Sequence, residues 1–166
     1  IEGSERSLMR GDKPLPAHAP WCMGCGEDNP NGLHLEVHLH GDHVYADLQF
    51  DERHSGAPGL AHGGAISAAC DDIMGFTLWI AETPAVTRTL TVEYRRPVPL
   101  HTPVHITASL VDETDRALFI EANGTVGDTT YFAAEAVFVK VDLSHFLRHG
   151  DWGATADLIT RFFQAD

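Results

Sequence analysis

The residues best suited to chemistry lie in one stretch, where His62, Gly63 and Gly64 precede the adjacent aspartates Asp71 and Asp72. The aspartates stand among small and apolar residues. In such surroundings a carboxylate either activates a water as a general base or attacks an acyl carbon as a nucleophile. Backbone N–H groups at a helix start polarise a carbonyl or hold an oxyanion. The stretch therefore combines backbone groups that suit a carbonyl or an oxyanion with carboxylates that suit a base or a nucleophile, and the choice between base and nucleophile stays open.

A long helix is needed to position these residues. Apolar side chains recur near the helical period, which predicts a single helix within residues 58–80 that begins at the glycines. Those positions are Ile66, Cys70, Ile73, Thr77 and Ile80. Glycine costs a helix about 1 kcal/mol relative to alanine, so two in succession indicate that something approaches the backbone there. A rise of about 1.5 Å per residue puts Asp71 roughly 10–12 Å from the glycine amides, so the two groups can meet only across two copies of the chain.

A second group of chemically capable residues lies nearer the N-terminus, at Cys22 and Cys25, with His18 four residues before the first cysteine. Cys-x-x-Cys is half of a zinc knuckle, the spacing of a redox pair, or a turn that buries two small thiols. The second half of a zinc site is not apparent, because no other Cys-x-x-Cys exists and Cys70 falls within the predicted helix. We therefore expect a buried turn, and neither a metal nor another cofactor.

Together the two motifs resemble those of a known family. The histidine–diglycine step followed by aspartate at the ninth position, and the Cys-x-x-Cys-Gly turn followed by Asn-Pro-Asn-Gly-Leu at residues 29–33, are similar to motifs of hotdog-fold acyl-CoA thioesterases of the PaaI and THEM4-like type. The resemblance covers about residues 20–141. It implies an α+β fold in which an antiparallel sheet wraps a long central helix, and active sites shared by two subunits.

The resemblance also implies roles for individual residues. Asp71 would be the catalytic carboxylate, Gly63 and Gly64 would supply the amides that polarise the thioester carbonyl, and the Thr87 hydroxyl would orient water or the carboxylate. His62 either touches the substrate or only hydrogen-bonds backbone at the helix start. The helical period itself does not choose between Asp71 and its neighbour, because both fall off the apolar stripe.

The strand pattern supports the implied fold. Apolar and polar residues alternate through a hairpin over residues 33–50, and strand-forming residues dominate four later segments. Those segments are residues 85–96, 102–112, 116–126 and 129–141. We expect a six-stranded antiparallel sheet with the helix on one face. His34, His38 and His40 share the polar face of the first strand, where solvent exposure is commoner than metal binding.

The domain organisation follows from the same patterns. Residues 1–20 are polar and rich in glycine and proline, which predicts an irregular arm, and the thioesterase-like domain occupies residues 21–141. Residues 142–166 have helical spacing around two glycines, so two short helices are expected there. Exposed Trp152 and Phe162-Phe163 would suit packing on the body of the protein or on a neighbouring subunit.

Composition limits the partners. The chain has 166 residues and a net charge of −13, which opposes broad contact with nucleic acid or anionic lipid. No stretch reaches the ~18 apolar residues of a membrane span. An acidic ligand therefore needs local cations, and Arg88, Arg95 and Arg96 are candidates. Arg95 and Arg96 either bind the phosphates of coenzyme A or are solvated at a strand end.

Three cysteines suggest a reducing compartment, with the cytoplasm as the simplest case.

The function expected from these observations is hydrolysis of acyl-CoA thioesters to a free acid and coenzyme A by a homodimer or larger assembly. A Gly-x-Ser-x-Gly elbow is absent from the sequence, which disfavours serine hydrolysis. One alternative is a hotdog module that binds acyl-CoA or lipid without catalysis. An enoyl-CoA hydratase is a weaker one. The acyl chain length and the assembly beyond a dimer are not encoded in any motif.

Overall fold

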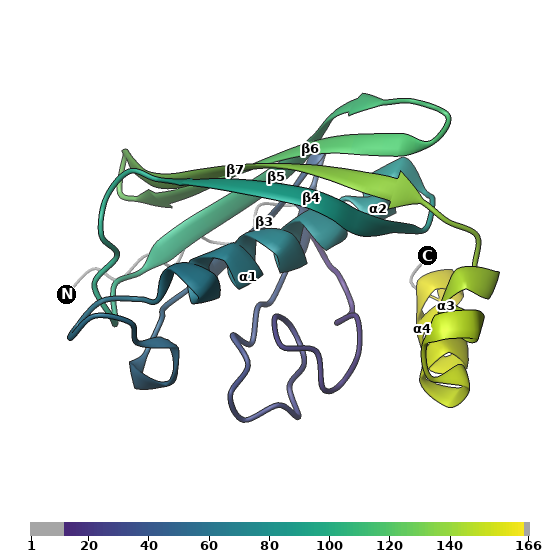
Figure 1. Ribbon diagram of the computed structural model, residues 1–166, viewed down its shortest axis with the longest axis horizontal. Coiled ribbons are helices and arrows are strands. Elements are labelled where there is room, and N and C mark those ends of the chain that lie inside the picture. Colours follow the sequence, from purple (N-terminus) through teal and green to yellow (C-terminus); the bar gives the residue numbers. More distant parts are fainter. Residues whose placement is uncertain (1–11, 165–166) are drawn as a thin grey trace.

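One antiparallel sheet with a helix packed along one of its faces dominates the molecule (Figure 1). The computed structural model describes residues 12–164, with side chains through Arg161. The strands are β1 (Lys13–Pro14), β2 (His38–His40), β3 (His43–Leu48), β4 (Ala85–Tyr94), β5 (Val104–Glu113), β6 (Ala117–Val126) and β7 (Thr129–Lys140). The helices are the 3-10 turn η1 (Glu52–His54), α1 (Gly63–Gly75), α2 (Leu78–Ala81), α3 (Ser144–His149) and α4 (Trp152–Gln164).

The sheet has seven strands in the order β1-β2-β3-β5-β6-β7-β4, so the six expected strands are joined by β1. This two-residue strand pairs with β2 and lies inside the arm that the sequence predicted to be irregular. Residues 1–11 of that arm lie outside the described residues. The four later strands match the predicted segments within a few residues at each end.

The core lies between α1 and the sheet. Side chains of β6 alternate between buried and exposed positions, as a strand with one covered face requires. The buried side chains of α1 are Ile66, Ala69, Cys70, Ile73 and Met74. Each large apolar side chain buried there contributes about 1.5–3 kcal/mol to stability. This contact fixes the face of α1 that turns toward the sheet.

The predicted single helix is interrupted at Phe76 and Thr77. The N–H groups of both residues bond to carbonyls three residues earlier, and the Thr77 hydroxyl donates to the Met74 carbonyl at 2.7 Å. A hydroxyl that binds the preceding turn competes with regular helix bonding. As a result α1 ends at Gly75, and only the short α2 follows.

The first strand of the predicted hairpin is shorter than expected. His34 has φ +52, which breaks the extended run, and the N–H groups of Leu33 and Leu35 bond to the carbonyls of Met23 and Gly24. Residues 33–35 therefore pair with the cysteine turn instead of continuing β2. Leu35 is still buried, as the alternation predicted. His34 consequently does not share a strand with His38 and His40 as the sequence had suggested.

The C-terminal segment forms the two helices α3 and α4, which lie beyond one end of the sheet (Figure 1). Trp152 at the start of α4 is 69% exposed. The side chains of Phe162 and Phe163 lie outside the described residues. Among residues 12–164, no helix has the length and apolar character to cross a bilayer.

Candidate functional site

A hydrogen bond joins the predicted carboxylate to the predicted hydroxyl. Thr87 Oγ1 on β4 donates to Asp71 Oδ1 on α1 at 2.7 Å. One oxygen of the carboxylate is thereby held by a side chain of the sheet. The structure thus brings together two residues sixteen positions apart that the family resemblance had paired.

A bulge in β4 aims Thr87 at α1. Thr87 pairs with Phe138 and Thr89 with Val137, so Arg88 is an extra residue on the β4 side. In a regular strand, Thr87 and Tyr94 would point to opposite faces because they are seven residues apart. The extra residue shifts the alternation, and both side chains contact α1. The sequence analysis did not predict this bulge.

The start of α1 is capped by His62. The His62 Nδ1 accepts a hydrogen bond from the Gly64 N–H at 2.8 Å. An accepting Nδ1 carries no proton, so the imidazole is neutral with its proton on Nε2. The amides of Ala65 and Ile66 bond to the His62 carbonyl. Of the two predicted carbonyl-polarising amides, that of Gly63 has no acceptor among the described residues, whereas that of Gly64 serves the cap.

Tyr94 holds the first turn of α1 against the sheet. Its hydroxyl donates to the Gly63 carbonyl at 2.8 Å and lies 2.5 Å from Ser67 Oγ. A Cβ added at Gly63 would lie 3.4 Å from the Tyr94 ring, an ordinary contact distance. The sequence analysis did not single out Tyr94 or Ser67, because nothing in the pattern places the end of β4 against the glycines.

A hollow of about 300 Å³ lies beside this helix start. His62, Gly64 and Ala65 line it from the α1 side, and Met23 and Arg53 line it from the loops. It is the described cavity nearest to the predicted amides. A larger apolar hollow of about 440 Å³ lies elsewhere, between α2 and the C-terminal helices, and does not include the Asp71 carboxylate.

The two predicted phosphate-binding arginines differ in their surroundings. Arg95 and Arg96 are both exposed, and both amides bond to the Tyr131 carbonyl. The Arg95 guanidinium donates to Glu93 at 2.9 Å. For the Arg96 guanidinium the described residues provide no ion pair, so Arg96 is the more available cation at this end of β4.

Within one chain, Asp71 and the Gly63 amide do not share a site. They are eight residues apart on one helix, which corresponds to about 12 Å along its axis. No single reacting atom can contact both groups over that distance. The separation that the sequence predicted therefore persists in the folded chain.

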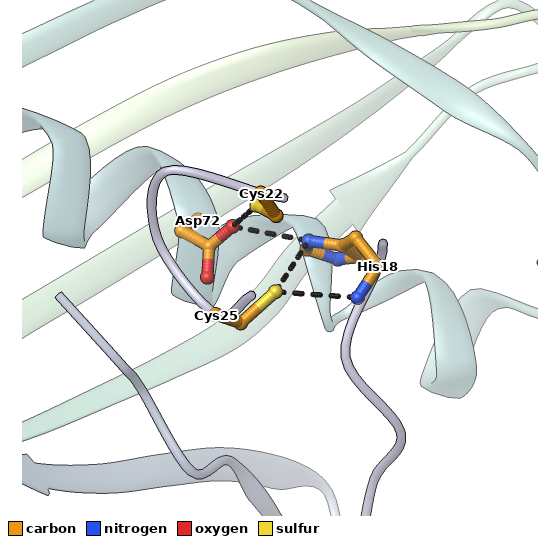
Figure 2. Close-up of side chains that lie close together, drawn as sticks. All are labelled: His18, Cys22, Cys25 and Asp72. Atoms are coloured by element: carbon orange, nitrogen blue, oxygen red, sulfur yellow. Dashed lines mark hydrogen bonds and ion pairs between the residues drawn. The ribbon is translucent and has the colours of Figure 1, made fainter. Parts of the chain in front are cut away.

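The carboxylate of Asp72 lies in a different group of side chains, formed with His18, Cys22 and Cys25 (Figure 2). Asp72 Oδ1 lies 3.0 Å from His18 Nδ1 and 3.2 Å from Cys22 Sγ, and Cys25 Sγ lies 3.4 Å from His18 Nδ1. The one ligand atom of each residue lies within 4.8 Å of the other three. The sequence analysis had placed His18 beside the two cysteines, but it did not predict that Asp72 joins them.

The close packing of this group shifts the acidity of its members. Burial raises the pKa of Asp72, although His18 opposes that shift. Burial would lower the pKa of His18, but hydrogen bonds to Asp72 and Cys22 outweigh it and raise the pKa to about 9. A hydrogen bond from Cys25 lowers the pKa of the Cys22 thiol. The same hydrogen bond to Cys22, together with burial, raises the pKa of the Cys25 thiol, so the two thiols are shifted in opposite directions.

Comparisons with known proteins agree on one family. Residues 58–133 match the thioesterase superfamily. Acyl-coenzyme A thioesterase THEM4 of Mus musculus is 37% identical over 89 residues, which cover 52% of this chain and 38% of that protein. The Bos taurus protein of the same name is 36% identical and covers 52% of this chain and 36% of its own length. The chain spans less than half the length of these curated relatives.

Solved structures share the fold at lower identity. A thioesterase superfamily protein superposes with a TM-score of 0.65 and 23% identity, covering 69% of this chain and 60% of that chain. A hypothetical thioesterase from Streptococcus pneumoniae, solved with coenzyme A, gives a TM-score of 0.61 and 19% identity, covering 64% and 85%. The expected hotdog fold is therefore confirmed.

Proposed function

Because residues 58–133 match the thioesterase superfamily and the chain has the hotdog fold of its solved structural neighbours, we propose that it hydrolyses acyl-CoA thioesters to a free acid and coenzyme A. The observation that carries the proposal is the Asp71 carboxylate held by Thr87 at 2.7 Å on the central helix. Asp71 is then the catalytic carboxylate, and Thr87 positions it.

The proposed chemistry uses the two ends of α1. The Gly63 N–H donates to the thioester carbonyl oxygen and stabilises the negative charge that develops there. Asp71 takes a proton from a water that attacks the carbonyl carbon, the C–S bond breaks, and the proton returns to the departing thiolate. In the alternative route Asp71 attacks the carbonyl carbon itself, and water hydrolyses the resulting anhydride. Gly64 joins the amide site only if His62 releases its N–H.

The site is completed, in this proposal, by a second copy of the chain at the free edge of β4. Within the described residues, this ten-residue strand pairs only with β7, and a long unpaired edge is a template for another strand. One end of β4 touches α1 at Asp71 through Thr87, and the other end touches it at Gly63 through Tyr94.

Two-fold antiparallel pairing of β4 with its copy lays the Thr87 end of one strand beside the Tyr94 end of the other. Neighbouring strands lie about 4.8 Å apart, so this arrangement brings Asp71 of one chain toward the helix start of the partner. A homodimer is therefore the smallest assembly that unites the two groups.

Arg96 supplies a cation for the phosphates of coenzyme A at the same end of β4. A cytoplasmic location remains a prediction from the three cysteines.

The experiment that tests the proposal measures free thiol release from short-chain, long-chain and aromatic acyl-CoAs by the purified protein and by Asp71→Asn. Loss of a general base costs about 10²–10⁴-fold in rate, so the variant should lose nearly all turnover while its circular dichroism spectrum is unchanged. Asp72→Asn is not a matched control here, since Asp72 belongs to the other side-chain group. Asp128→Asn, the same change at an exposed residue in the turn between β6 and β7, is the control.

Three results would contradict the proposal. Full turnover by Asp71→Asn would remove Asp71 from the mechanism. Saturable acyl-CoA binding without turnover across the panel would favour a binding module. Formation of 3-hydroxyacyl products from enoyl-CoA would favour a hydratase.

A further inference from the structure

We propose that His18, Cys22, Cys25 and Asp72 form a structural zinc site that fixes the N-terminal segment to the central helix. Three of the ligands come from one loop, and the fourth comes from α1, some fifty residues later (Figure 2). This proposal reverses the expectation from the sequence that the chain holds no metal. It does not depend on the proposed hydrolysis.

The spacing of the four ligand atoms fits a tetrahedral ion. Zinc binds sulfur at about 2.3 Å and nitrogen or oxygen at about 2.0–2.2 Å, which puts the ligand atoms of one tetrahedron about 3.3–3.8 Å apart. The hydrogen-bonded ligand atoms of His18, Cys22, Cys25 and Asp72 are separated by 3.0, 3.2 and 3.4 Å. These three separations need to expand by only a few tenths of an ångström, and every remaining pair of ligand atoms lies within 4.8 Å, close enough for the four to gather around one Zn²⁺ ion.

The ligand types select the metal. Two thiolates and one imidazole favour zinc over magnesium or calcium, which prefer oxygen ligands. Four protein ligands fill the tetrahedron and leave no open position for a substrate or reacting water. The site is therefore structural and not catalytic.

Glycines allow the loop to approach the helix. A Cβ added at Gly24, between the two cysteines, would lie 2.1 Å from Cγ of Asp72. A Cβ at Gly26 would lie 2.4 Å from the backbone nitrogen of Cys22. The Gly26 N–H bonds to the Cys22 carbonyl at 2.9 Å, which closes the turn around the two thiols. The backbone is thus shaped so that both sulfurs and the carboxylate converge.

The His18 ring is also held in place. It stacks on the Phe76 ring with a centroid distance of 4.1 Å, and a Cβ at Gly75 would lie 3.1 Å from the imidazole. Packing against α1 therefore fixes the direction of Nδ1 before a metal binds. A preorganised imidazole is what a high-affinity site needs.

The Asp72 carboxylate is an independent sign that a ligand is expected. Its side chain is 8% exposed, and its Oδ2 is a buried oxygen with no hydrogen-bond partner among the described residues. A buried carboxylate oxygen without a partner is costly, and a cation in the cluster removes that cost. His18 and the Cys22 thiol account for Oδ1, but neither provides a partner for Oδ2.

Zinc in this position would stabilise the candidate active site indirectly. Asp72 follows Asp71 on α1, and Met23, between the two cysteines, lines the hollow beside His62. The metal would therefore fix the loop that borders this hollow and the helix turn that carries Asp71.

The test uses the full chain, stripped with a chelator under reducing conditions and then titrated with Zn²⁺ or Co²⁺ alone. We expect one tightly bound zinc per chain by elemental analysis and an increase in Tm on binding. Cobalt should give thiolate-to-metal charge-transfer absorption and the strong visible bands of a tetrahedral complex. The cobalt spectrum reports the ligands in the unmutated protein, so the test does not depend on variants that fail to fold.

Matched variants then assign the ligands. Cys25→Ser and Asp72→Asn should lose stoichiometric zinc, whereas Cys70→Ala and Asp71→Asn should retain it. Both controls change the same residue types on α1, outside the cluster. The proposal is overturned if the reduced, folded chain binds no stoichiometric zinc, or if Cys25→Ser binds it as well as the unmutated protein. A disulfide between Cys22 and Cys25 in freshly purified, metal-free protein would also overturn it in favour of a redox pair.

Discussion

Asp71 and Asp72 are adjacent in the sequence, but their carboxylates lie in different environments: Asp71 accepts a hydrogen bond from Thr87 at 2.7 Å, whereas Asp72 lies 3.0 Å from His18. Successive residues of an α-helix point about 100° apart, so neighbouring side chains can serve separate sites. The helical period left the choice between these aspartates open. Their partners distinguish them, because one faces a strand hydroxyl and the other faces a histidine and two thiols.

Replacing Thr87 by valine should reduce turnover without unfolding the chain. The substitution preserves the shape but removes the donor to Asp71, and a hydrogen bond to a charged group is worth about 1.5–3 kcal/mol. We expect kcat to fall about 10–100-fold with KM little changed. Thr87→Ser retains the hydroxyl and should recover most of the rate. Equal activity in the valine and serine variants would show that Thr87 does not position Asp71.

Arg96→Gln should weaken binding of the coenzyme A part of the substrate. Loss of one charge-assisted hydrogen bond to phosphate should raise KM about tenfold. An acyl-pantetheine thioester lacks the nucleotide phosphates, so its KM should not change. Arg95→Gln is the matched control, because Arg95 already pairs with Glu93 and should have a smaller effect. An equal rise in KM for both substrates would contradict a phosphate contact.

Gly24→Ala should destabilise the chain. Its Cβ would lie 2.1 Å from the Asp72 side chain, so the cysteine turn must move away from α1. Forced overpacking of this kind costs about 1–3 kcal/mol, measurable as a lower free energy of unfolding in urea. At Gly153 in α4, a Cβ meets nothing closer than 3.5 Å, and Gly153→Ala should be neutral or stabilising by up to about 1 kcal/mol. Equal stability of the two variants would be inconsistent with tight packing between the turn and the helix.

The elements predicted best from the sequence were those with a regular local period. Alternating polarity and strand-forming composition predicted β4 to β7, and the periodic apolar residues predicted α1. Local spacing does not reveal that Thr77 ends the helix by bonding to Met74, or that residues 33–35 pair with the cysteine loop around the positive φ of His34. Both outcomes depend on backbone partners that compete with the regular element.

The candidate site was predicted in part for a related reason. The pair Asp71 and Thr87 came from the family resemblance, but the bulge at Arg88 that aims Thr87 at α1 leaves no mark in the composition of β4. Asp72 completes the cysteine motif from fifty residues away, and a search for a second Cys-x-x-Cys does not find an aspartate. The positions of Thr87 and Asp72 depend on contacts between segments that are distant in the sequence, and residue spacing does not predict such contacts.

Gly63→Pro should remove the proposed carbonyl-binding amide at little structural cost. Proline is well tolerated at the first position of a helix, and His62 before it already has φ −65 and ψ 137, which suit a residue preceding proline. Loss of one oxyanion donor costs about 10²–10³-fold in kcat. Gly63→Ala keeps the N–H and should retain most of the activity. Similar kcat values for the two variants would exclude the Gly63 amide from the mechanism.

The most direct measurement of a site shared by two chains is the activity of mixed Gly63→Pro and Asp71→Asn proteins. Each variant alone lacks one group in every site, whereas each mixed dimer contains one site with Gly63 from the Asp71→Asn chain and Asp71 from the Gly63→Pro chain. After dissociation and random reassembly of equal amounts, the account predicts recovery of about one quarter of wild-type thiol release per chain. If mixed dimers form, as shown by two affinity tags, and no activity returns, the shared site is contradicted.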